Sequence, residues 1–122
     1  MNVLVGIGGT DRSFEALEAA IARAREADDD LTVAIYRHED VDEPLDAIEG
    51  HVQDELVTAG IDAELRRIED HAASQLVEIA DGERFDRLVL AGGERSALGK
   101  IRIGDLVEFV LLNAETTVTL VR

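Results

Sequence analysis

Short apolar runs alternate along the chain with segments in which apolar residues return every three or four positions. The runs, one of them a weaker alternating segment, predict five β-strands at residues 3–7, 31–36, 61–68, 85–91 and 116–121. The helical spacing predicts four α-helices between them, within residues 14–24, 45–56, 72–80 and 107–114. Strands separated by a helix run parallel and need right-handed crossovers. The pattern therefore predicts one α/β domain, residues 1–122, with a doubly wound five-stranded parallel sheet.

Residues that start and stop helices support these boundaries. Thr10, Asp11 or Ser13 can cap the first helix, Pro44 fits the start of the second, and Gly60 fits its C-cap. The apolar stripes predict the buried side of each helix. The stripe residues are Phe14, Leu17, Ile21, Ala24, Leu45, Ile48, Val52, Leu56, Leu76, Ile79, Ala80, Val107, Val110, Leu111 and Ala114.

The loops after the first and fourth predicted strands are the natural ligand site. On open parallel sheets, ligands bind beyond the carboxyl ends of the strands, where the strand order reverses. The second of these loops joins a strand to a helix and carries glycines and three cations, a layout that holds phosphate groups because free backbone N–H groups point at the anion. The candidate binding residues are Gly8, Gly9, Thr10, Gly92, Gly93, Arg95, Ser96, Lys100, Arg102 and Gly104.

Two acidic residues in the same region oppose anion binding. Asp105 opens the fourth predicted helix, where its carboxylate can cap the N–H of Val107 or Glu108, with Glu108 answering in a capping box. Those N–H groups are the ones that a phosphate needs. Glu94 adds a second negative charge. The three cations therefore have two interpretations, a residual anion or nucleotide site and a solvated loop that pairs with neighbouring acids.

Charge is the most unusual property of the composition. Asp and Glu number 27 against 12 Lys and Arg, the net charge is −15, and Lys100 is the single lysine. Because molar salt screens such repulsion, we interpret the charge as adaptation to high salt. The alternative is an acidic surface that captures a basic partner protein. The chain has neither a basic stripe nor an aromatic platform, which argues against nucleic-acid binding.

The sequence gives no support for catalysis, metal binding or insertion into a membrane. The histidines lie far apart and the serines fall in no nucleophile motif; these residues are His38, His51, His71, Ser13, Ser74 and Ser96. His51 and Asp54 have the spacing of a weak metal clasp, for which an exposed ion-pair face is the alternative. The chain lacks cysteine, a membrane-length apolar run and a signal-peptide pattern, so a cytoplasmic location is expected.

Several segments together resemble the universal stress protein family over the whole chain. They are the Val-Leu-Val strand with its Gly-Thr turn (3–10), Ala-Leu-Glu-Ala-Ala (16–20), Phe-Asp-Arg-Leu-Val-Leu-Ala-Gly-Gly (85–93), Arg-Ser-Ala-Leu-Gly-Lys (95–100), Gly104 and Thr-Val-Thr-Leu-Val (117–121). The resemblance implies a Rossmann-like three-layer sandwich of the adenine nucleotide alpha hydrolase-like type. It also implies a function in stress response.

That family has branches that bind nucleotides and branches that do not. Binders resemble Gly-x2-Gly-x9-Gly followed by Ser or Thr, with an Asp after the first strand that contacts the nucleoside. Gly104 matches the last glycine, but Ala91, Glu94 and Asp105 stand at the other loop positions and Gly8 stands at the Asp. The resemblance therefore implies a degenerate motif with no cofactor expected, and with ATP or AMP as the alternative.

The last predicted strand offers a contact to a second copy of the chain. Its residues are Thr117, Val118, Thr119, Leu120 and Val121. Their alternation suits a strand at a sheet edge, which can pair with its copy. Members of the family commonly dimerise through this strand; the alternative is an edge covered by the chain's own helix.

Together these features predict a non-enzymatic homodimer that acts in stress response without a strong ATP site. One alternative is a switch that binds ATP or AMP, with Arg95, Lys100 and Arg102 on the phosphates. Another alternative is an acidic adaptor for an unknown protein partner.

Overall fold

The computed structural model describes residues 1–92, 94–95 and 101–122, with the backbone alone at residues 94, 95, 101 and 102. The elements in chain order are β1 (Asn2–Ile7), α1 (Asp11–Ala27), β2 (Asp30–Ile35), α2 (Leu45–Ala59), β3 (Glu64–Arg67), α3 (Ala72–Gly82), β4 (Arg87–Ala91), β5 (Glu94–Arg95), β6 (Ile101–Arg102), α4 (Asp105–Asn113) and β7 (Thr117–Val121). Each predicted strand and helix is present. The α/β prediction is confirmed.

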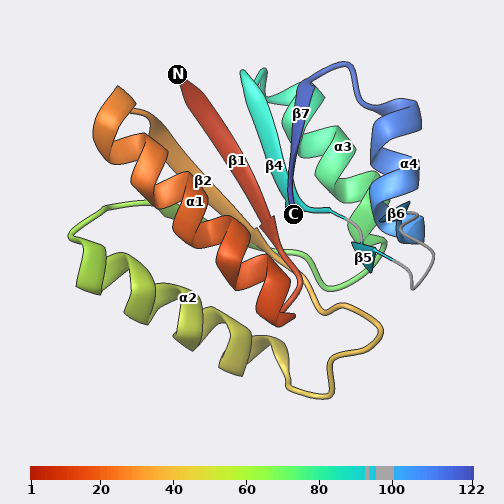
Figure 1. Cartoon of the computed structure of the whole chain (residues 1–122), viewed down its shortest axis with the longest axis horizontal. Coiled ribbons are helices and arrows are strands. Elements are labelled where there is room, and N and C mark those ends of the chain that lie inside the picture. The colour runs from red at the N-terminus through yellow and green to blue at the C-terminus, as the bar shows by residue number, and fades with distance from the viewer. Residues whose placement is uncertain (93, 96–100) are drawn as a thin grey trace.

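One parallel sheet organises the molecule. Its strand order is β3-β2-β1-β4-β7, and all neighbouring strands in it run parallel. Helices α1 and α2 cover one face, and α3 and α4 cover the other (Figure 1). β5 and β6 form a separate antiparallel pair between β4 and α4, which the pattern does not predict.

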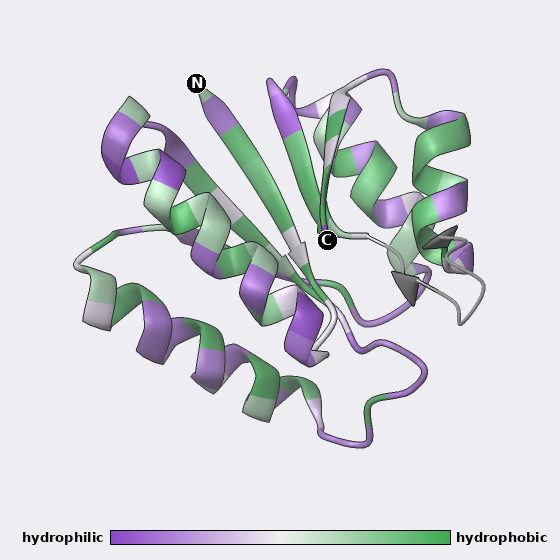
Figure 2. Ribbon diagram, viewed as in Figure 1, coloured by the Kyte–Doolittle hydropathy of each residue, from purple (hydrophilic) through white to green (hydrophobic). Residues whose placement is uncertain are grey.

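Apolar side chains fill both faces of the sheet. Val5 and Ile7 pack with Leu17 beneath α1 and α2, whereas Leu4 packs with Leu76 on the face covered by α3, and all five are fully buried. Strands covered on both faces read as continuous apolar runs. Figure 2 shows this as hydrophobic stretches along β1 and β4.

Most helix-end signals agree with the structure, and one stripe is partly wrong. Thr10 caps α1, and α2 ends at Gly60 in the left-handed region, with φ of +70°. On α4, Val107 and Val110 are buried as expected, but Leu111 is 43% exposed. The reason is that α4 packs against α3 through the face that carries Val107 and Val110. No helix in the described ranges combines the length and apolarity needed to cross a membrane.

Candidate functional site

The carboxyl ends of β1 and β4 define the predicted crevice. The strand order reverses here, because β1 has β2 on one side and β4 on the other. Gly8, Gly9 and Thr10 follow β1, Gly92 follows β4, and Gly104 precedes α4, which starts at this edge of the sheet (Figure 1). Five of the ten predicted site residues therefore lie along the same edge.

The other five predicted residues belong to the segment between β4 and α4. Arg95 and Arg102 lie on β5 and β6, which pair antiparallel. Gly93, Ser96 and Lys100 lie outside the described residues. That the three cations of this segment hold an anion stays a prediction.

The turn after β1 is held by the cap of α1. The N–H of Ser13 donates to Oγ1 of Thr10 at 3.2 Å, and the Ser13 hydroxyl donates to the Thr10 carbonyl at 2.6 Å and accepts from the N–H of Gly9 at 3.2 Å. Gly9 has φ of +92°, and a Cβ there would lie 2.7 Å from Cδ1 of Ile48. Gly9 and Thr10 thus have structural roles that require no ligand.

A tyrosine ring covers the residue that follows β1. A Cβ on Gly8 would lie 2.8 Å from Cε2 and 2.9 Å from Cζ of Tyr36, closer than carbon atoms approach. The backbone fixes this contact, because the N–H of Tyr36 donates to the Ile7 carbonyl at 3.0 Å and the N–H of His38 donates to the Gly8 carbonyl at 2.9 Å. Tyr36 is buried, and this burial raises its pKa to about 12. Its hydroxyl therefore stays protonated at neutral pH.

The sequence pattern predicts Tyr36 as the end of a strand but not as a residue beside the candidate site. A usable signal was present, since Tyr36 ends the second apolar run and therefore stands at the carboxyl edge beside β1. Its contact with Gly8 joins two strands that are far apart in the chain. Periodicity within one segment carries no information about such a contact.

Gly92 and Gly104, the two described glycines of the second loop, differ in whether there is space for a side chain. A Cβ on Gly92 would lie 2.7 Å from Cβ of Leu120, and the N–H of Gly92 donates to the Val121 carbonyl at 2.9 Å. Gly104 is the N-cap of α4, and a Cβ there would have nothing within 4 Å. Packing against β7 therefore explains Gly92 but not Gly104.

The expected cap by Asp105 is wrong. α4 begins at Asp105, its N-cap is Gly104, and no side chain bonds at the cap; the N–H of Glu108 donates to the Gly104 carbonyl at 3.0 Å. Asp105 stands one position too late for an N-cap geometry. Among the described residues, no side chain caps the first turn of α4, although Asp105 and Glu108 still place two negative charges where an anion would approach.

Comparison with known proteins identifies the family. The model of the universal stress protein family matches residues 1–122. The chain belongs to this family. It is therefore a stress-response protein of the universal stress protein family. No curated relative matches the chain.

Solved structures of the family share the fold. A universal stress protein in complex with cAMP is 27% identical, with a TM-score of 0.76, 100% of this chain covered and 96% of the other. The universal stress protein from Archaeoglobus fulgidus is 21% identical, with a TM-score of 0.77 and coverage of 100% and 98%. The Archaeoglobus fulgidus protein in complex with dAMP is 19% identical, with a TM-score of 0.71 and the same coverage.

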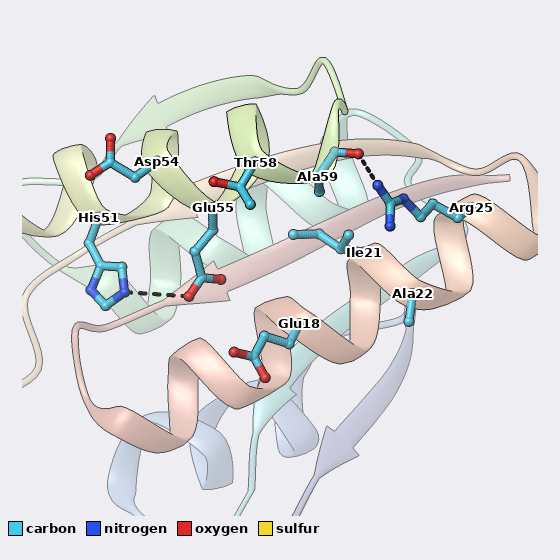
Figure 3. A pocket seen from close by; sticks show the side chains of 9 residues that line it. All are labelled: Glu18, Ile21, Ala22, Arg25, His51, Asp54, Glu55, Thr58 and Ala59. Carbon is cyan, nitrogen blue, oxygen red and sulfur yellow. Dashed lines mark hydrogen bonds and ion pairs between the residues drawn. The ribbon is translucent and has the colours of Figure 1, made fainter.

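A groove between α1 and α2 lies apart from the predicted site residues of this universal stress protein. It has a volume of about 620 Å³ and is lined by Glu18, Ile21, Ala22, Arg25, His51, Asp54, Glu55, Thr58 and Ala59 (Figure 3). His51 Nε2 lies 3.4 Å from Glu55 Oε1, so His51 pairs with Glu55 and not with Asp54. Arg25 donates to the carbonyl of Ala59. Within the described part of the chain, no three His, Cys, Asp or Glu are placed to hold a metal ion.

An aspartate at the end of α3 holds the segment that leads into β7. Asp81 accepts the Thr116 hydroxyl at 2.6 Å, the Thr116 N–H at 3.0 Å and the Glu115 N–H at 3.1 Å. The hydrogen bonds from the Thr116 side chain and the Glu115 backbone lower the pKa of Asp81. We call this arrangement the Asp81 clamp, and its role is structural.

Proposed function

We propose that the chain works as a non-enzymatic homodimer in the stress response and that its crevice holds no nucleotide tightly. The observation that carries the dimer is the uncharged strand β7, which stands at an edge of the described sheet. Two further features support the proposal: large apolar side chains are exposed on α4, and the described groups with shifted pKa values are engaged in structural contacts.

Within the described residues, neither a charge on β7 nor a further strand protects this sheet edge against pairing. Strand β7 stands last in the strand order, so in the described sheet one of its sides faces no other strand. Residues Thr117–Val121 contain no charge, although 32% of the chain is charged. Natural sheets protect free edges with charges, proline or a covering element. An uncharged edge supports pairing with the same edge of a second copy, which closes as a two-fold dimer.

The helix that leads into β7 exposes large apolar side chains. Phe109 and Leu112 are 39% and 77% exposed and lie three positions apart, on one side of α4. Ile103, just before the helix, is 43% exposed. Grouped apolar side chains at a surface mark protein contacts. This group supports an interface that includes α4.

Catalytic turnover finds little support in the described side chains. Tyr36 has a pKa of about 12, too high for acid–base catalysis at neutral pH. Other shifted groups are engaged elsewhere: Arg66 donates to Glu83 at 2.8 Å, Arg67 donates to Asp46 at 2.6 Å, and Asp81 forms its clamp. These contacts explain the shifts without a reaction.

Light scattering in molar KCl tests the dimer. We expect a mass twice the 13.3 kDa of one chain. Thr119→Glu would place a charge at the centre of β7 beside its copy, and should weaken the dimer by at least about tenfold. Thr58→Glu on the exposed side of α2 is the matched control and should leave the mass unchanged. A monomer at all concentrations, or equal effects of the two variants, would contradict the proposal.

The uncapped start of α4 favours a second candidate, a switch that binds an adenine nucleotide. A relative 27% identical to this chain is known in complex with cAMP, which supports the same candidate. Thermal unfolding with millimolar ATP–Mg separates the two. A Kd near 10 μM would add about 2.7 kcal/mol of stability at about 1 mM ligand. We expect no such shift, and a shift of that size would favour the switch.

A further inference from the structure

The space beyond the end of β1 is filled by one side chain from the neighbouring strand. Tyr36 follows β2 directly, and its Cε2, Cζ and Oη atoms lie 2.8, 2.9 and 3.1 Å from the position of a Cβ on Gly8. The ring therefore occupies the place where a side chain at residue 8 would project. Gly8 owes its identity to this contact, since its φ lies outside the left-handed region.

The Tyr36 ring is anchored in the apolar layer beneath α3. It belongs to the buried cluster that includes Leu4, Ile68 and Leu76, and it is 8% exposed. The structure gives the hydroxyl no hydrogen-bond partner among the described residues. The ring thus has an apolar body in the core and a polar tip toward the carboxyl edge.

The position of this ring limits what can bind beyond the carboxyl end of β1. On an open parallel sheet a ligand binds beyond the carboxyl ends of the strands, which here places it near the end of β1 and the start of α4. A phosphate at the start of α4 would stay at the surface. An aromatic base, in contrast, needs an apolar recess, and the recess beside Gly8 is already taken by a phenol ring.

We propose that Tyr36 is the specificity-determining residue of the crevice and that its ring excludes the nucleoside part of an adenine nucleotide. The inference rests on the proposed function, in which no nucleotide binds tightly, and it names the side chain responsible. The Tyr36 ring and an aromatic base would need the same space beside Gly8, so only one of them can lie there. Shortening residue 36 should therefore open the crevice to an aromatic ligand.

Binding of adenosine to Tyr36→Ala tests the proposal by calorimetry and thermal unfolding in molar KCl. Removing the ring leaves an apolar hole beside Gly8, and such holes bind small aromatic molecules. We expect Tyr36→Ala to bind adenosine at least about tenfold more tightly than the unchanged protein. Phenol, which matches the missing ring, reports whether the hole forms. Tyr36→Leu serves as the second variant if Tyr36→Ala does not fold.

Two control variants separate the ring from other effects. Tyr36→Phe keeps the ring and loses the hydroxyl, so it should behave as the unchanged protein does. Val110→Ala removes buried volume from the same apolar layer at a position on α4, and should gain no adenosine binding. An equal gain in either control would overturn the proposal.

A stability cycle with Gly8 gives a readout that needs no ligand. Gly8→Ala collides with the ring and should destabilise the unchanged protein, whereas it should be nearly neutral in Tyr36→Ala. Additive effects of the two substitutions would overturn the proposal. So would folded Tyr36→Ala that gains no adenosine, whether or not phenol binds. If the unchanged protein binds ATP tightly and Tyr36→Ala binds adenosine more tightly still, the proposed function fails and the role of Tyr36 stands.

Discussion

Gly8 follows β1 and Gly92 follows β4. Neither position has room for a side chain, because a bulky neighbouring side chain already fills the space. Tyr36 is that neighbour for Gly8, and Leu120 is that neighbour for Gly92. Glycines in a loop of this kind are commonly interpreted as positions where the protein backbone approaches a ligand closely. At these two residues packing gives a sufficient reason. Gly104 is different, because nothing packs near it.

Asp81→Asn should destabilise the protein at neutral pH. The substitution removes the negative charge that three donors from Glu115 and Thr116 share. Charged hydrogen bonds of this kind contribute about 1–3 kcal/mol, and we expect about 1 kcal/mol because water still reaches the carboxylate. Chemical unfolding of both proteins at neutral pH measures the difference.

The pH dependence of that difference follows from the lowered pKa of Asp81. A carboxyl whose pKa is lower in the folded state stabilises the protein above its unfolded pKa, near 3.9, and loses this effect as the pH falls through the folded value. The difference between the two proteins should therefore be full at neutral pH and shrink below about pH 4. Asp62→Asn, at an exposed position, is the control. If the difference in unfolding free energy between the two proteins grew as the pH fell, the charged carboxylate of Asp81 would not be the source of the stabilisation.

At the level of elements, strands and helices could be predicted because their periods are local. The apolar run of β1 and the stripe of α1 each identify an element within a few residues of its bounds. The short pair β5 and β6 could not be predicted, since two-residue strands carry no period. The cap of α4 was misplaced by a single residue, from Gly104 to Asp105, which is the usual uncertainty of a helix boundary.

The candidate site was less predictable than the fold. Sequence spacing placed its two loops at the correct edge of the sheet, because the order of parallel strands determines which ends meet. The contact between Tyr36 and Gly8 depends instead on the register of β2 against β1 and on the direction of one side chain. Neither the strand register nor the direction of the side chain can be predicted from the pattern within one segment.

Asp105→Ser should strengthen anion binding at the start of α4. The substitution removes one of two negative charges from a first turn in which no described side chain caps an N–H group. Near-surface charges of this kind change binding by a few-fold, and Glu94→Gly in the same chain should add to the effect. Titration with inorganic phosphate at low salt measures the change. Asp62→Ser controls for net charge, and an equal response would mean that position 105 has no special role.

At the scale of the whole molecule, the net charge predicts how stability depends on salt. The net charge of −15 on 122 residues produces repulsion that acts over about 10 Å at about 0.1 M salt and over about 3 Å at about 1 M. Part of it is concentrated between β2 and α2, where Glu39, Asp42 and Glu43 are all exposed. Weak surface ion pairs cannot offset such an excess of acids.

Stability should therefore rise as KCl increases from low to molar concentration. Screening of acid–acid repulsion is the cause, and thermal unfolding across the salt series is the measurement. Replacing Glu39, Asp42 and Glu43 by their amides should raise stability at low salt and flatten the dependence. Sucrose at matched osmolality controls for exclusion from the protein surface. Stability that falls with KCl would contradict salt adaptation.

The central position of β1 also has a consequence for the order in which the chain folds. In the sequence, one neighbour of β1, the strand β2, follows after a single helix, whereas the other neighbour, β4, follows after three. Asn2 and Asp86, which are 84 residues apart in the chain, exchange hydrogen bonds beside β1 and β4. Contacts of such long separation close large loops and slow folding. The pairing of β1 with β2 closes a much shorter loop than the pairing of β1 with β4. We therefore expect the contact between β1 and β4 to limit the rate at which the sheet is completed.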